Sequence, residues 1–207
     1  MWEILDKIKP GEIVLVEYSS NMNPTRILHE IIKWAKSKEY QVLITDMYNL
    51  VELHTYRMKM EGLDMEVLNW AKIIEIGRHE PTVGEVIKFI PVDRELLALL
   101  AEYKEVYEEF VNKNFTVVLF FGLERYMLFK NEVVSFVSIL ERFLGDTRRI
   151  SIYFVNRDVL TNISPDPLPL LEELATTIMK FQKGTKKIKF TINKALNPEL
   201  EGYEEYC

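Results

Sequence analysis

Short apolar runs alternate along this chain with segments of helical periodicity, and this alternation limits the folds open to it. The run Phe115–Phe121 is almost wholly apolar, as expected of a strand that is covered on both faces. The segment Leu96–Phe110 instead repeats its apolar residues at three- and four-residue steps, which is typical of a helix. Strands that alternate with helices favour an α/β fold with a mainly parallel, doubly wound sheet and helices on both faces.

The same reading gives a set of expected elements. Strands are predicted at Glu12–Tyr18, Gln41–Thr45, Lys72–Ile76, Gly84–Pro91, Phe115–Phe121, Ile150–Val155, Thr176–Phe181 and Lys187–Ile192. Helices are predicted from Pro24 through Ala35, at Leu50–Met60, from an Asp93 cap through Phe110, at Glu132–Leu144 and at Leu170–Leu174. Pro91 cannot donate to a strand ladder, so Gly84–Pro91 should be an edge or hairpin strand.

The domain organisation follows from these elements. We expect residues 1–196 to form one domain, with the strands that start at Ile13, Gln41, Phe115 and Ile150 at the centre of its sheet. The last two strands should form an antiparallel hairpin around the turn at residues 183–186. Residues 197–207 are acidic and lack periodicity, so we expect a flexible tail.

Charge and composition exclude several classes of function. The net charge of −6 argues against a nucleic-acid surface, which needs clustered Lys and Arg. No apolar run is long enough to span a bilayer, and the first residues do not resemble a signal peptide. The only cysteine is Cys207, so no internal disulfide is expected and a cytoplasmic location is favoured. Only two glutamines occur, Gln41 and Gln182, a bias found in hyperthermophile proteins, although asparagine is not depleted.

The first strand leads through a polar loop, residues 19–23, into the first helix, which is where a phosphate-binding loop would lie. Such a loop needs glycines, whose backbone N–H groups can wrap phosphates, and a Lys followed by Ser or Thr. Here the loop has no glycine and no lysine, and Thr25 and Arg26 stand where the hydroxyl and the charge would be. Arg is a planar fork and not the compact ammonium that fits between phosphates.

Ligands of open parallel sheets bind beyond the carboxyl ends of the strands. We therefore place any retained site in the crevice at the loop, where the free N–H groups of the helix N-terminus could attract an anion, a carboxylate or a chain terminus. The competing outcome is that Asn23 and Thr25 cap those N–H groups and close the site. The candidate ligand-binding residues are Ser19, Ser20, Asn21, Asn23, Thr25 and Arg26, with Asp46 and Arg157 adding opposite charges from neighbouring strand ends.

Two further features have structural and functional readings. Glu17 lies within an apolar strand, where an unpaired carboxylate is costly. It is either a general base with a raised pKa, or a partner of Arg157 or Arg26, or in contact with water at the strand end. The histidines His29, His54 and His79 are far apart, so we expect no metal site.

The order of these elements resembles the RecA/KaiC-like branch of the phosphate-loop ATPases, over roughly residues 1–196. The strand, loop and helix from Ile13 take the place of the phosphate loop, and Val117–Leu123 resembles the second nucleotide motif. The segments Thr177–Phe181 and Lys187–Lys194 resemble the terminal hairpin of that family. More narrowly, the chain looks like a member of a small family of unknown function from hyperthermophilic archaea.

The departures from that family decide the expected function. Phe121 or Gly122 stands where the family has a metal-orienting Asp, so the resemblance implies the fold without ATP hydrolysis. We expect a non-catalytic domain with no cofactor that binds a protein or peptide, and the sequence leaves open a homo-oligomer. The alternative is an enzyme or sensor that binds a nucleotide or an adenosine-containing cofactor, with Asp46 on the ribose.

Overall fold

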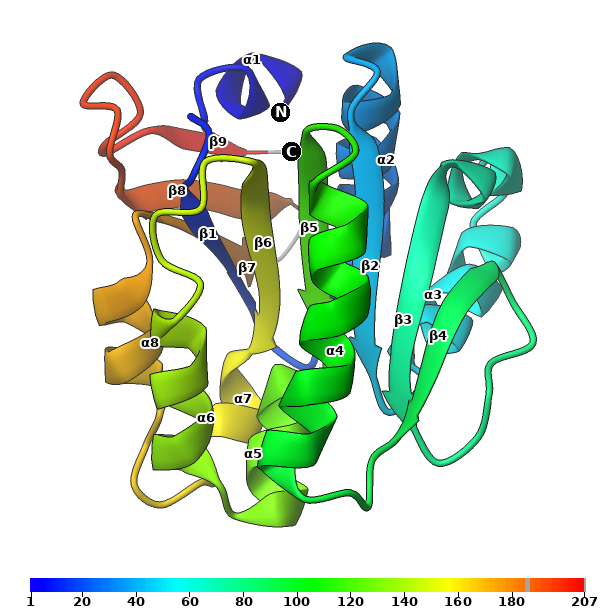
Figure 1. The fold of residues 1–207 in the computed structure, drawn as a ribbon. Coiled ribbons are helices and arrows are strands. Elements are labelled where there is room, and N and C mark those ends of the chain that lie inside the picture. The colour runs from blue at the N-terminus through cyan, green and yellow to red at the C-terminus, as the bar shows by residue number, and fades with distance from the viewer. Residues whose placement is uncertain (185–186, 207) are drawn as a thin grey trace.

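The computed structural model describes residues 1–184 and 187–206. One sheet of nine strands runs through the described residues, in the order β4-β3-β2-β5-β6-β1-β7-β8-β9 (Figure 1). The strands are β1 Ile13–Tyr18, β2 Gln41–Met47, β3 Ala71–Gly77, β4 Glu85–Pro91, β5 Thr116–Phe121, β6 Arg149–Asn156, β7 Thr177–Lys183, β8 Ile188–Lys194 and β9 Glu204–Tyr206. Along the sheet from β4 through β1 to β7, every neighbouring pair of strands is parallel. Strand β8 pairs antiparallel with both β7 and β9. The predicted α/β class with a C-terminal antiparallel hairpin is confirmed.

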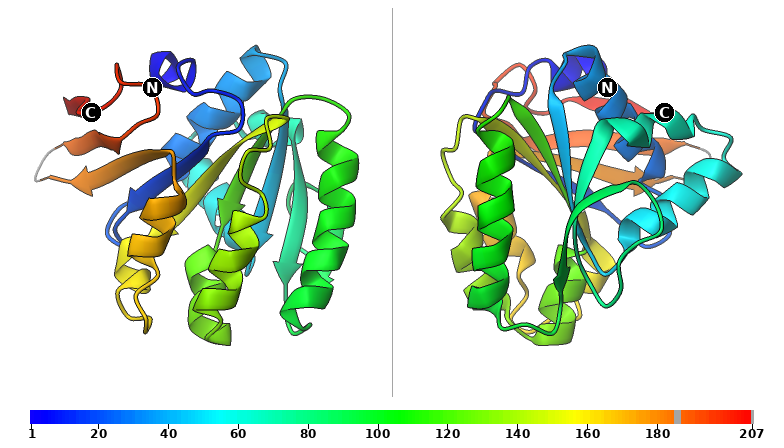
Figure 2. Two further views of the ribbon diagram at one scale, coloured as in Figure 1. Left: turned by 60° about the vertical axis from the view of Figure 1, so that its left-hand side comes forward. Right: turned by 45° about the vertical axis from the view of Figure 1, so that its right-hand side comes forward.

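Helices cover both faces of the sheet (Figure 2). The first face carries α1 Trp2–Leu5, α2 Thr25–Ser37, α3 Leu50–Met60 and the 3-10 helix η1 Met65–Trp70. The second face carries α4 Leu96–Val111, α5 Leu123–Lys130, α6 Val133–Glu141, α7 Arg157–Leu160 and α8 Leu168–Leu174. No helix of the described residues is long and apolar enough to cross a membrane.

The central strands are apolar because both of their faces are covered. Val118 and Phe120 lie on the α4 and α6 side of β5 and are 0% and 9% exposed, respectively. Val117, Leu119 and Phe121 point to the opposite layer and are also buried. The pattern of β5 was therefore a reliable indicator of a strand in the interior of the sheet.

Several element boundaries differ from the prediction. The cap position of α2 is Pro24 and not Asn23, and that of α4 is Glu95 and not Asp93. In the second case the chain first makes a turn, in which the Arg94 N–H donates to the Pro91 carbonyl. The predicted helix at residues 132–144 is shorter and is preceded by α5, which ends at Asn131, a residue with a left-handed φ of 54°.

The C-terminal segment contains a strand instead of lacking regular structure. Residues Glu204–Tyr206 form β9 and pair with β8, and Lys189 and Glu204 form an ion pair of 2.8 Å between these two strands. Leu200 is 2% exposed and packs into the core on the α2 side. One buried leucine and a free strand edge thus order a segment whose composition alone predicted a flexible tail. Cys207 and the turn residues Thr185 and Lys186 lie outside the described part of the chain.

Candidate functional site

The loop that follows β1 is tied to the end of β6. The Ser20 N–H donates to Asp158 Oδ2 over 2.7 Å. The side chains of Ser20 and Asn156 are also hydrogen-bonded, with the Asn156 amide 3.0 Å from Ser20 Oγ. Within the loop the Met22 N–H donates to the Ser19 carbonyl and the Ser19 hydroxyl to Asn21 Oδ1. Two of the loop N–H groups therefore already have acceptors, and one of those acceptors is a carboxylate.

The loop residue Asn23 caps the first backbone N–H group of α2. Its Oδ1 accepts from the Thr25 N–H at 3.2 Å and from the Thr25 hydroxyl at 2.5 Å. Of the predicted capping, the structure shows the part that involves Asn23, for one N–H group; Thr25 donates here and does not itself cap a backbone N–H. Met22 and Thr25 are buried.

Thr25 also contacts His54 of α3, at 3.0 Å from Nδ1. The Thr25 hydroxyl already donates to Asn23, so it accepts here, which assigns the proton to His54 Nδ1. Burial lowers the pKa of His54 to about 3, helped by the charges of Arg57 and Arg125. The imidazole is therefore neutral, and its buried Nε2 has no hydrogen-bond partner among the described residues.

Arg26 does not point its charge into the loop. Its Nε lies 2.7 Å from Glu61 Oε2 at the end of α3, and its side chain is 71% exposed. The other oxygen of Glu61 accepts from the Asn23 amide at 2.5 Å. Glu61 thus holds the loop and neutralises the one cation that was predicted to replace the missing lysine.

Asp46 is buried below the start of α3 and does not line the crevice. Its two carboxylate oxygens accept from the Leu50 and Val51 N–H groups at 3.0 and 2.8 Å. Glu75 on the neighbouring β3 is also buried and accepts from the Asn49 N–H at 3.1 Å. Burial raises the pKa of both carboxyl groups. Because β5 and β6 separate β2 from β1 in the sheet, Asp46 caps a helix far from the loop.

Arg157 is drawn to Glu17. Its Nε lies 3.3 Å from Glu17 Oε2, and Lys180, the neighbour of Glu17 on β7, lies at the same distance. Lys180 also pairs with Glu172 of α8 at 2.7 Å. Burial raises the pKa of Glu17 to about 7, although Lys180 opposes the effect. Of the readings left open for Glu17, the structure shows both the ion pair with Arg157 and the raised pKa, and the side chain, which is 0% exposed, does not reach water.

The structure thus brings Ser19, Ser20, Asn21, Asn23, Thr25 and Arg26 together and places Asp46 elsewhere. Arg157 lies beside the loop, between Asn156 and Asp158, but its charge is paired with Glu17. The set of candidate ligand-binding residues leaves out three residues of this edge. Asp158 enters the loop from α7, His54 reaches Thr25 from α3, and Glu124 is buried at the start of α5. Burial raises the pKa of Glu124 to about 7. Glu124 and Asp158 lie shortly after the ends of β5 and β6, and this position is the signal that the sequence carries for them.

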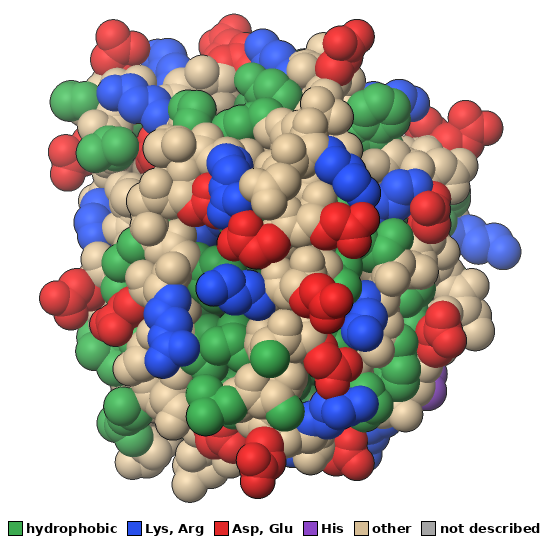
Figure 3. All heavy atoms as spheres, viewed as in Figure 1, with side chains coloured by type: hydrophobic (Ala, Val, Ile, Leu, Met, Phe, Trp, Pro, Cys, Tyr) green, Lys and Arg blue, Asp and Glu red, His purple; other side chains and the backbone are tan. Residues whose placement is uncertain are grey.

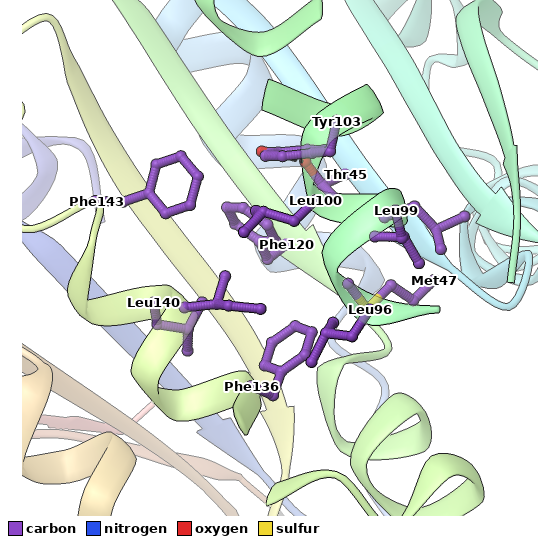
Figure 4. Close-up of a pocket in the computed structure, with 12 residues that line it drawn as sticks. Thr45, Met47, Leu96, Leu99, Leu100, Tyr103, Phe120, Phe136, Leu140 and Phe143 are labelled. Atoms are coloured by element: carbon purple, nitrogen blue, oxygen red, sulfur yellow. Dashed lines mark hydrogen bonds between the residues drawn. The ribbon is translucent and has the colours of Figure 1, made fainter. Parts of the chain in front are cut away.

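Two further observations bear on ligands. No group of three His, Cys, Asp or Glu side chains within residues 1–184 and 187–206 is arranged to hold a metal ion. An apolar cavity of about 30 Å³ lies between α4, α6 and the sheet (Figure 4), room for about one water molecule. Among the described residues that line it, the polar side chains are Thr45 and Tyr103, whose hydroxyls are 3.1 Å apart. This space is a packing gap and not a ligand site.

Comparison with known proteins agrees with this fold. The structure is similar to the KaiC-like protein PH0186 of Pyrococcus horikoshii OT3, with a TM-score of 0.67 and 13% identity over 95% of this chain and 85% of the other. The fold is RecA/KaiC-like. A second structure, that of PH0250 from the same organism, has a TM-score of 0.79 and 25% identity over 97% of this chain and 94% of the other.

The sequence profile of one family matches residues 3–205, and the chain belongs to that family, DUF257, described as Pyrococcus protein of unknown function. This confirms the expected relation to hyperthermophilic archaea. No curated protein sequence matches the chain.

Proposed function

We propose that this protein is a RecA-like domain that does not hydrolyse nucleotides and that acts by binding a protein partner in the cytoplasm. The observation that carries the first part is the use of the loop N–H groups by the chain itself. The N–H groups of Ser20, Met22 and Thr25 donate to Asp158, Ser19 and Asn23, respectively. A phosphate would have to displace the Asp158 carboxylate, and no lysine is present in the loop to compensate its charge.

An apolar stripe on α3, beside the loop, supports the second part. Leu53, Tyr56 and Met60 recur at helical spacing and are 37%, 62% and 72% exposed. Glu61, the residue after α3, is the one that holds Asn23 and Arg26. Glu61 therefore links the end of the stripe to the loop, and an exposed apolar patch of this kind is typical of a protein contact.

A crosslinking experiment tests the partner surface. A photoreactive phenylalanine at position 56 should give a defined protein adduct in cells, because Tyr56 lies on the apolar stripe. The matched control is position 97 on α4, where Leu97 is also exposed, at 69%. Adducts from both positions alike, or from neither, contradict the proposal.

The alternative, a nucleotide or adenosine-cofactor site at the same edge, is favoured by one observation. Arg57 and Arg125 are half-buried, and neither forms an ion pair with a carboxylate of the described residues. Their charges act on the nearby Tyr18 and His54. A thermal-shift screen with ATP, ADP, GTP, NAD and S-adenosylmethionine separates the two functions, since a ligand of the native state raises the midpoint.

A further inference from the structure

A second cavity lies at the carboxyl ends of the strands, as the loop after β1 does, but on the side of the sheet formed by β2, β3 and β4. It has a volume of about 540 Å³ and is lined by residues at the ends of β3 and β4 and at the end of α5. Its lining includes three aromatic side chains and three charged ones: Tyr48, Phe89, Phe129, Arg78, Lys130 and Asp93. A cavity of this size is ordinary for a small-molecule site.

The charges in this cavity are not used by the protein. Arg78, Lys130 and Asp93 form no ion pair within 4.0 Å with any described residue, although salt bridges such as Arg94 to Glu102 occur nearby. Two cations and one carboxylate give the cavity a formal charge of +1. That balance matches a monoanion, and Asp93 disfavours a ligand with more negative charge.

The backbone beside this cavity is strained at Tyr48, one of the residues that line it. Tyr48 and Asn49 both have left-handed φ values, 66° and 57°, which are rare for a bulky residue such as tyrosine. Two hydrogen bonds stabilise this backbone conformation. The buried Glu75 accepts from the Asn49 N–H, and the Asn49 side-chain amide donates to the His79 carbonyl. The result is an edge-to-face contact between Tyr48 and Phe129, with ring centroids 5.1 Å apart. Strain of this kind is concentrated at ligand sites.

We infer that this cavity binds a small aromatic monocarboxylate. The rings of Tyr48, Phe89 and Phe129 pack against a planar ligand, since aromatic rings prefer stacked or edge-to-face neighbours. Arg78 and Lys130 bind the carboxylate, and the fork of an arginine fits its two oxygens. The site is separate from the loop after β1 and does not depend on whether the loop binds a partner.

The test is a fluorescence titration of the whole protein with 2-naphthoate. We expect saturable binding in the wild type and a loss of at least about tenfold in affinity in the double variant Arg78→Gln with Lys130→Gln, because a lost charge contact is worth that factor. Phe129→Ala should weaken binding as well. Arg142→Gln is the control, since Arg142 is an exposed arginine on the end of α6, and it should bind like the wild type.

Two ligand controls complete the design. The neutral 2-naphthamide should bind at least about tenfold more weakly than 2-naphthoate if the charge is recognised. Asp93→Asn should bind the carboxylate more tightly, because it removes the one carboxylate among the described residues that line the cavity. Equal binding of the amide, unchanged binding in the double variant, or no saturation below about 1 mM overturns the inference.

Discussion

Asp158 Oδ2 lies 2.7 Å from the backbone nitrogen of Ser20, so a carboxylate of α7 accepts from the loop that follows β1. The two residues are 138 positions apart in the sequence. They meet because β1 and β6 are adjacent and parallel, with Tyr18 opposite Asn156. An acid in this position both fixes the loop and disfavours a phosphate.

Removal of this carboxylate should loosen the loop without unfolding the protein. We expect Asp158→Ala to lower the free energy of unfolding by about 1 kcal/mol, since it deletes one charge-assisted hydrogen bond of an exposed side chain. Urea denaturation measures the change. Glu105→Ala on the exposed face of α4 is the control and should stay within about 0.5 kcal/mol of the wild type. Equal stability of the two variants contradicts a role for Asp158 in the loop.

Glu124 should make the stability depend on pH. Burial raises the pKa of its carboxyl from 4.5 to about 7, so the folded protein holds a proton that the unfolded chain releases. Linkage then requires the stability to fall as the pH rises from about 4.5 to 7. Glu17, Asp46 and Glu75, whose pKa values are also raised, act in the same direction.

The variant Glu124→Gln isolates this contribution, because glutamine resembles the protonated acid. Its stability should fall less steeply than that of the wild type between pH 4.5 and 7, the range set by the pKa values. Chemical denaturation at a series of pH values measures the slope. Glu105→Gln, a change at an exposed site, should keep the wild-type slope; an unchanged slope in Glu124→Gln shows that Glu124 does not titrate as proposed.

The hydrogen bond between the Thr45 and Tyr103 hydroxyls should contribute more to the free energy of unfolding than a hydroxyl on the surface. Tyr103→Phe leaves the buried Thr45 hydroxyl without its partner, which is 3.1 Å away in the wild type. We expect a loss of about 1–2 kcal/mol in the free energy of unfolding. Tyr56→Phe removes an exposed hydroxyl and should have little effect. Thermal and urea denaturation both report this difference, and equal effects of the two variants contradict it.

Leu200 should hold the C-terminal strand in place. Leu200→Ala removes a side chain that is 2% exposed and should cost about 2–4 kcal/mol. It should also increase hydrogen exchange in β9, where pairing with β8 otherwise protects the backbone. Leu196, which is 54% exposed, provides the control in Leu196→Ala. Exchange in β9 that is already fast in the wild type argues that the strand is not held by Leu200.

The sequence was a good guide to the strands and a poor guide to the site. The existence of β5 and its place in the interior of the sheet follow from a local apolar pattern, that of Phe115–Phe121, which a single chain displays directly. Figure 3 shows that the surface over α4 and α6 mixes charged and apolar side chains, so surface composition indicates no site there.

The site could not be predicted because its contacts are long-range. Asp46 seemed available at the end of β2, but Glu75 of β3 and the turn at Asn49 bury it. Arg157 follows β6, yet Glu17 and its neighbour on β7 determine where its charge lies. Pairings of this kind depend on strand order and register, which local periodicity does not encode.

We propose that the loop after β1 binds no phosphate, because its N–H groups at Ser20, Met22 and Thr25 donate to acceptors of the chain itself. Calorimetric titration of the wild type with Mg²⁺-ATP tests this most directly, with an assay of phosphate release on the same samples. We expect no binding heat and no turnover above background, in the wild type and in Asp158→Asn. Binding or turnover that is abolished by Arg26→Ala contradicts it, because Arg26 would then serve as the missing lysine despite its contact with Glu61.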